Sequence, residues 1–249
     1  MLDRCAREES VGVPGSLGVP AGAIRVNLIT AFFGSSIGKK WIVAATGLML
    51  VGYVVGHMVG NLQIFAGPEK INRYAAFLHS MPGTLWMVRI ILLAALLLHI
   101  VITLQLAVEN RGARAEGYAR RNRVQATLAA RTMAWSGLIV LAFVLYLLAH
   151  FTVRITDPRF HALPRGEFDV YSMIILGFQH PLVSGFYILG VFLLCLHLSH
   201  GLESMLQSLG ANSRAVRGPI VRAGQILAVL IFLGYISIPV AVLAKFLKV

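Results

Sequence analysis

The chain has 249 residues, of which 57% are hydrophobic and 13% are charged, and its mean hydropathy is +0.77. Soluble domains carry about 25% charged residues, so this composition excludes an ordinary soluble domain. The net charge of +12 does not indicate nucleic-acid binding, because the basic residues lie in short segments between apolar runs, without an aromatic and basic surface motif. The two cysteines, Cys5 and Cys195, form no spaced framework, which argues against a disulfide scaffold.

The N-terminal segment, residues 1–30, is predicted to be an irregular extension on the cytoplasmic side. Residues 11–24 are rich in Gly and Pro, and the first 40 residues lack the continuous apolar core of a cleavable signal peptide. Residues 31–249 are predicted to form one all-α membrane domain.

Five stretches of this domain are free of charged residues for long enough to cross a bilayer, which takes about 20 apolar residues. In chain order they are Trp41–Pro68, Ile90–Val108, Thr132–Val153, Val170–Leu202 and Ala223–Ala244. The fourth stretch is too long for one crossing, and Pro181 predicts a break between an interfacial segment and the helix proper. We therefore expect an integral membrane bundle of five transmembrane helices.

The distribution of basic residues predicts the orientation of the bundle. If residue 1 is inside, 14 Lys and Arg residues fall on the inner side and 7 on the outer side. The positive-inside rule then places the N-terminus in the cytoplasm and the C-terminus outside, in a bacterial cytoplasmic (inner) membrane.

Four of the predicted spans carry an interior histidine, namely His57, His99, His150 and His197. Ionisable groups in a membrane are costly and usually functional. At about 1.5 Å per residue, His57 and His150 lie roughly 24 and 28 Å from the inner surface, and His99 and His197 roughly 15 Å from it. The histidines thus form two layers about 10 Å apart, with two histidines from different helices in each layer.

Paired imidazoles at one depth suit a haem with an axial ligand on each face. We therefore predict two haem b groups, an outer one held by His57 and His150 and an inner one held by His99 and His197. His200, one turn from His197, is a second candidate for the inner ligand or for a haem contact. Zinc or copper would need three or four ligands around one ion; a proton relay and plain packing are the alternatives to haem.

These residues resemble a known family, the membrane cytochrome b subunit of succinate dehydrogenase and fumarate reductase, in its single-subunit dihaem branch. The similarity lies in Ser35–Lys40 before the first helix, in Gly56–Leu62, in the order of the four histidines, and in His197 standing four residues before Gly201, with Gly210 nine further on. It covers roughly residues 30–249 and favours His197 over His200. Some fumarate reductases of this branch have a glutamate where this chain has Cys195, a poor proton carrier.

The resemblance implies a membrane anchor that passes electrons between an iron–sulfur subunit and a quinone. The partners would be a flavoprotein subunit with FAD and a subunit with iron–sulfur clusters, docked on the cytoplasmic face, and the quinone would be menaquinone by analogy. A quinone pocket near the outer haem has these polar candidates: Asn61, Gln63, His79, Arg89 and His180.

Two other classes remain open at this point. One is the dihaem anchor of a different respiratory dehydrogenase, and the other is a haem-free transporter or structural membrane protein. The chain has no Gly-rich dinucleotide motif and no cysteine cluster, so succinate oxidation itself is not expected in this subunit.

Overall fold

The computed structural model describes residues 34–112, 128–164, 166, 168–208 and 214–249. These residues are helical or irregular, and no strand occurs among them. The predicted N-terminal extension, residues 1–30, lies outside the described residues.

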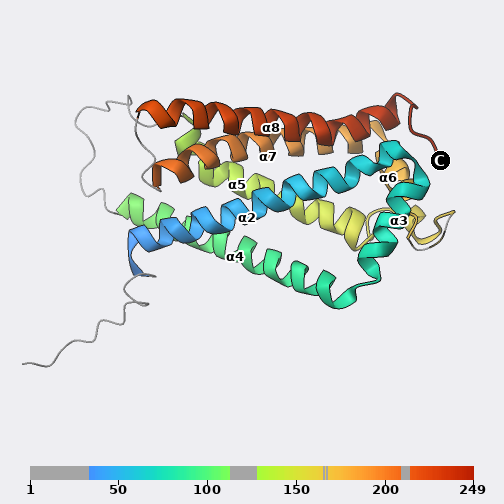
Figure 1. Ribbon diagram of the computed structural model, residues 1–249, viewed down its shortest axis with the longest axis horizontal. Coiled ribbons are helices and arrows are strands. Elements are labelled where there is room, and N and C mark those ends of the chain that lie inside the picture. Colours follow the sequence, from blue (N-terminus) through green and yellow to red (C-terminus); the bar gives the residue numbers. More distant parts are fainter. Residues whose placement is uncertain (1–33, 113–127, 165, 167, 209–213) are drawn as a thin grey trace, which may run out of the picture.

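Five long helices form the body of the molecule (Figure 1). They are α2 (Ser36–Leu62), α4 (Pro82–Gly112), α5 (Leu128–Leu147), α7 (Pro181–Ser208) and α8 (Arg214–Leu243). In the described part of the chain all five are long and apolar enough to cross a membrane. This confirms the predicted five-span, all-α architecture of a multi-pass membrane protein.

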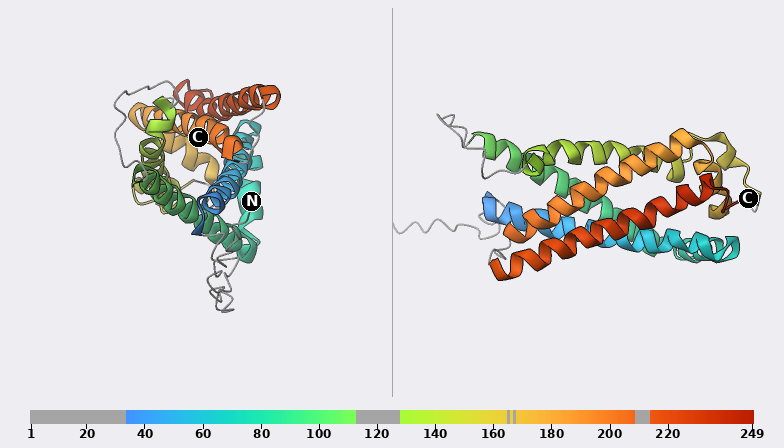
Figure 2. Two further views of the ribbon diagram at one scale, coloured as in Figure 1. Left: turned by 90° about the vertical axis from the view of Figure 1, so that its left-hand side faces the viewer. Right: turned by 90° about the horizontal axis from the view of Figure 1, so that it is seen from above.

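The two ends of this bundle differ. The start of α2 lies at one end, here called the proximal end, and the C-terminus lies at the other (Figures 1 and 2). Two short helices, α3 (Pro68–His79) and α6 (Val170–Phe178), lie at the second end, here called the capped end. Single turns complete that end: η1 (Gln63–Ala66), the π-helical η2 (Leu148–Thr152) that continues α5, and η3 (Pro158–His161).

The long fourth stretch is divided as the sequence predicts. Helix α6 ends at Phe178 and α7 begins with Pro181, because proline has no N–H to donate and suits the first turn of a helix. The Ser184 hydroxyl donates to the Phe178 carbonyl over 2.7 Å and so satisfies an acceptor that α6 leaves open at its C-terminus.

A buried carboxylate joins the two short helices of the capped end. Asp169 is 0% exposed and accepts hydrogen bonds from Asn72 Nδ2 at 3.0 Å and from the Ser172 amide at 3.1 Å. Asn72 in turn accepts from the Tyr171 amide at 3.0 Å. The α3 helix was not predicted; this network explains its docking on the start of α6.

Glycines allow close contact between α5 and α7. A Cβ at Gly190 of α7 would lie 2.3 Å from Cδ2 of Phe143 on α5, and Phe143 is itself buried. Helices α5 and α7 therefore pack closely; His197 lies on α7 and His150 in the turn that continues α5.

Candidate functional site

The four predicted histidines lie on four different parts of the bundle. His57 is on α2, His99 on α4, His150 in the π-helical turn that continues α5, and His197 on α7. A π-helical turn is rare and is often found at functional sites, so the turn at His150 is itself informative.

His99 is bound to α2 through its Nδ1 atom. Thr46 Oγ1 lies 3.2 Å from His99 Nδ1, and the same hydroxyl donates to the Ile42 carbonyl at 2.7 Å. The next residue, Gly47, lies directly under the ring, because a Cβ there would be 3.2 Å from His99 Cε1. Any larger residue would press on the imidazole.

His197 is bound to α5 in the same way. Ser136 Oγ lies 3.1 Å from His197 Nδ1 and is 2.9 Å from the Met133 carbonyl, to which it donates. The next residue, Gly137, lies under the ring, with its Cβ position 3.2 Å from His197 Cε1. We call each hydroxyl residue and the glycine after it a hydroxyl–glycine socket.

The two sockets lie at similar depth. Thr46 is ten residues from the start of α2 and Ser136 eight from the start of α5, which corresponds to about 15 and 12 Å. His99 lies near enough to His197 for a charge on one to disfavour a charge on the other, and His200 is one turn from His197 on α7. The structure thus brings His99, His197 and His200 into one region near the proximal end.

His150 has a polar partner too, but in a different setting. Its Nδ1 lies 2.9 Å from the Tyr187 hydroxyl of α7, and its side chain is 3% exposed. Phe160 stacks on the imidazole at 5.3 Å and Phe151 lies at 4.3 Å, measured between ring centroids. This histidine is enclosed by aromatic rings.

His57 lies on a more open surface. Its ring stacks on Tyr53 at 5.4 Å and is 6.3 Å from the Tyr235 ring. Nothing lies within 4 Å of a Cβ placed at Gly52 or Gly56, so the neighbouring face of α2 has free space. Among the described residues no ring contact or hydrogen bond joins His57 to His150.

His57 and His150 nevertheless share a level. They are 21 and 22 residues from the starts of α2 and α5, or about 32 and 33 Å along the helices. Counted along the chain, His57 lies about 17 Å beyond Thr46 and His150 about 21 Å beyond Ser136.

The predicted quinone residues lie toward the capped end but do not form one cluster. Asn61 lies in the last turn of α2 and Gln63 begins η1. His79 binds the Ala75 carbonyl at 2.9 Å and packs on Phe168. Arg89 lies over the Trp86 ring at 5.1 Å, and His180 is an exposed residue between α6 and α7.

A charged pair holds the connection that follows His150. Arg159 donates to Asp157 Oδ2 at 2.5 Å and to the Leu176 carbonyl at 2.9 Å. The hydrogen bond from Arg159 lowers the pKa of Asp157 below its ordinary value. This pair ties the loop to α6 and keeps Phe160 beside His150.

The chemistry of the donors limits which groups this chain can bind. No cluster of three or more His, Cys, Asp or Glu side chains suited to a metal ion occurs in the described ranges. One buried oxygen near His99 is unsatisfied: Thr103 Oγ1 has no hydrogen-bond partner among the described residues. Thr103 lies one turn from His99 on the same face of α4.

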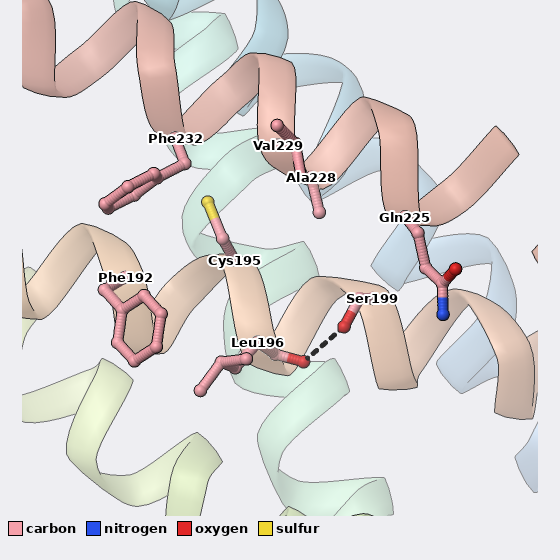
Figure 3. Close-up of a pocket in the computed structure, with 8 residues that line it drawn as sticks. All are labelled: Phe192, Cys195, Leu196, Ser199, Gln225, Ala228, Val229 and Phe232. Carbon is pink, nitrogen blue, oxygen red and sulfur yellow. Dashed lines mark hydrogen bonds between the residues drawn. The ribbon is translucent and has the colours of Figure 1, made fainter. Parts of the chain in front are cut away.

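An apolar pocket lies between α7 and α8 and contains none of the predicted histidines. Figure 3 shows its lining, in which the Cys195 thiol points toward α8. The lining residues are Phe192, Cys195, Leu196, Ser199, Gln225, Ala228, Val229 and Phe232. Since Cys195 belongs to this pocket, while His197 contacts α5, the thiol lies apart from the region of the inner histidines.

Comparison of the chain with protein-family models, with curated proteins and with solved structures finds no match. The residues that sequence reasoning missed are Thr46, Gly47, Ser136, Gly137 and Tyr187. The repeated pair of a hydroxyl residue followed by glycine was visible in the sequence, but it acquires meaning only once each pair is placed opposite a histidine.

Proposed function

We propose that this protein is the membrane anchor and electron-transfer subunit of a succinate:quinone oxidoreductase of the succinate dehydrogenase and fumarate reductase type. It would bind two b haems and pass electrons between an iron–sulfur subunit and a quinone. The observation that carries the proposal is the arrangement of four histidines, one on each of four successive spans and two at each of two depths.

The inner pair, His99 and His197, has the strongest support. Ligating histidines almost always use their second ring nitrogen to bind an oxygen of the protein, and both Nδ1 atoms do so here. The side-chain hydrogen bonds of both rings are made by Nδ1, so Nε2 is the nitrogen that would bind iron. His200 has no such socket, which favours His197 as the ligand on α7.

The outer pair, His57 and His150, fits a haem in part. Open space beside Gly52 and Gly56 suits a flat macrocycle near His57, and the Tyr187 hydroxyl orients His150. His150, however, is enclosed by Phe151 and Phe160. Binding at this level therefore requires these aromatic side chains to move aside.

The unsatisfied Thr103 hydroxyl supports a ligand near His99. A buried polar atom without a partner costs free energy, and a polar edge of a bound group would satisfy it. When bound, haem supplies a carrier of single electrons; the chain supplies the axial imidazoles, their orientation and a medium from which water is excluded.

The remaining parts of the proposal concern orientation and partners. The N-terminus would be cytoplasmic and the C-terminus outside, in a bacterial inner membrane, as the basic residues indicate. The FAD and iron–sulfur subunits would then dock at the proximal end, where Lys39 and Glu109 form an ion pair between α2 and α4. Menaquinone would react near the capped end, close to Asn61, Gln63 and His79.

The haem-to-protein ratio of the purified protein, with its copurifying subunits, tests this function. Reduced-minus-oxidised spectra should give a ratio near two, with a different haem lost in His57→Ala and in His99→Ala. His200→Ala is the matched control and should keep both haems. Colourless protein would refute the cytochrome function, and a hydrogenase or formate dehydrogenase as the copurifying partner would refute the assignment to succinate or fumarate.

A further inference from the structure

The two hydroxyl–glycine sockets are built alike although they belong to different helices. In each, the hydroxyl bonds Nδ1 of a histidine on a neighbouring helix, and the following glycine leaves room for the same ring. Each ring is therefore restrained at two atoms, Nδ1 and Cε1. Ordinary packing would restrain the ring but would not require a hydroxyl at the same position twice.

The hydroxyl hydrogens decide which tautomer each histidine adopts. A hydroxyl has one hydrogen, and in both sockets it is donated to a carbonyl of the hydroxyl's own helix: Ile42 for Thr46 and Met133 for Ser136. The oxygen can then only accept from the imidazole, so Nδ1 carries the proton. A neutral imidazole protonated at Nδ1 has its lone pair on Nε2.

We propose that Thr46 and Ser136 are positioning residues for the two axial ligands of one haem, the inner one. Each fixes the tautomer and the rotation of its histidine, so that Nε2 is presented to iron. The inference rests on the function proposed above and adds to it the residues that tune this haem.

The same hydrogen bonds should also set the redox potential. A histidine that donates its second N–H to an oxygen becomes a more basic ligand, and a more basic ligand stabilises ferric over ferrous iron. Removal of either hydroxyl should therefore raise the midpoint potential of the inner haem. If His99 and His197 hold one haem, as proposed above, both substitutions should affect that haem.

The test is a potentiometric titration of both haems, followed by optical spectra, on the purified full-length protein with its copurifying subunits. Thr46→Val removes the hydroxyl but keeps the shape of the side chain, and Ser136→Ala does the same on α5. The conservative variants Thr46→Ser and Ser136→Thr keep a hydroxyl. Ser237→Ala is the matched control, because Ser237 also bonds a carbonyl of its own helix, at 2.7 Å, but has no histidine partner.

We expect Thr46→Val and Ser136→Ala to raise the potential of the same haem, and the double variant to raise it further. The outer haem, the conservative variants and Ser237→Ala should keep wild-type potentials. Haem retained at an unchanged potential in both hydroxyl-deleted variants would overturn the inference, and so would shifts in two different haems. Wild-type protein without haem would instead overturn the proposed function itself.

If a hydroxyl-deleted variant loses haem entirely, the glycines provide a second measurement. Gly47→Ala and Gly137→Ala retain both hydroxyls but place a Cβ 3.2 Å from Cε1 of each ring. Both should alter the spectrum of the inner haem alone. An altered outer haem would contradict the placement of the sockets.

Discussion

Replacement of Gly190 by alanine should destabilise the protein through the contact between α5 and α7. The new Cβ would lie 2.3, 2.5 and 2.7 Å from three ring carbons of Phe143, distances that no side chain tolerates. The Phe143 ring cannot rotate freely, because the rings of Phe186 and Tyr187 pack beside it, with centroid distances of 6.0 and 5.6 Å. The helices must therefore move apart.

The loss of stability in Gly190→Ala can be compared with that of a matched control variant. Overpacking of this kind costs about 1–3 kcal/mol, whereas alanine in place of glycine inside a helix gains about 0.5–1 kcal/mol. Gly185, on the same helix, has nothing within 4 Å of its Cβ position. Gly185→Ala should therefore show only the stability gained by placing alanine in a helix, without the clash. The two variants should thus differ by about 1–3 kcal/mol.

Thermal unfolding in detergent, followed by circular dichroism, measures this difference. At about 2–4 °C per kcal/mol, Gly190→Ala should unfold roughly 5 °C below Gly185→Ala. Phe143→Leu makes room for the Cβ, so the double variant should recover part of the loss. Equal midpoints for the two alanine variants would refute the reasoning, because the backbone would then have accommodated the clash without cost.

Three further predictions concern the capped end and the inner region. Asp169→Asn should cost about 1–3 kcal/mol and speed proteolysis of the α3–α6 cap, because a neutral amide oxygen accepts the bonds from Asn72 Nδ2 and the Ser172 amide more weakly than the carboxylate does. The Asp157–Arg159 pair should stabilise its loop above the ordinary pKa of a carboxyl group, and this stability should be lost as pH falls through the lowered pKa of Asp157. The protection factors of the loop amides, which correct for intrinsic exchange, should therefore fall in acid, and in Asp157→Asn they should not depend on pH. Thr103→Val should lower haem content without lowering thermal stability, because it removes an unsatisfied hydroxyl.

Each of these three has a result that contradicts it. Wild-type proteolysis rates in Asp169→Asn would mean that the buried carboxylate does not hold the cap. Protection factors in Asp157→Asn that still fall in acid would assign the pH dependence to another group. Unfolding of Thr103→Val at a lower temperature, with full haem, would mean that the hydroxyl has a partner within the protein.

Much of the architecture follows from composition and spacing alone. The five spans and the break at Pro181 were predicted correctly, because long apolar runs and a proline without an N–H leave few alternatives. Helix α3 was missed, because its mixed polar and apolar residues give no transmembrane signal and its docking depends on Asn72 and Asp169, which are 97 residues apart in the chain.

The site was predictable at the level of helices but not of atoms. Counting residues predicts histidine depth, and it pairs His99 with His197 and His57 with His150, a pairing that stays a prediction. The hydrogen-bond partners of these histidines depend on how each helix is rotated about its axis and on which helices pack together. The spacing of residues along one helix predicts neither. The enclosure of His150 by Phe160 could not be foreseen, because that ring comes from a connecting loop tied down by Arg159.

The sockets have a consequence for how the protein is assembled in the membrane. The first lies between α2 and α4 and the second between α5 and α7, so each requires only spans that are near one another in the order of synthesis. Each half of the protein can therefore orient its own histidine before the other half has been inserted. The region that contains both sockets would then form when the α2–α4 pair and the α5–α7 pair associate, each with its histidine already oriented.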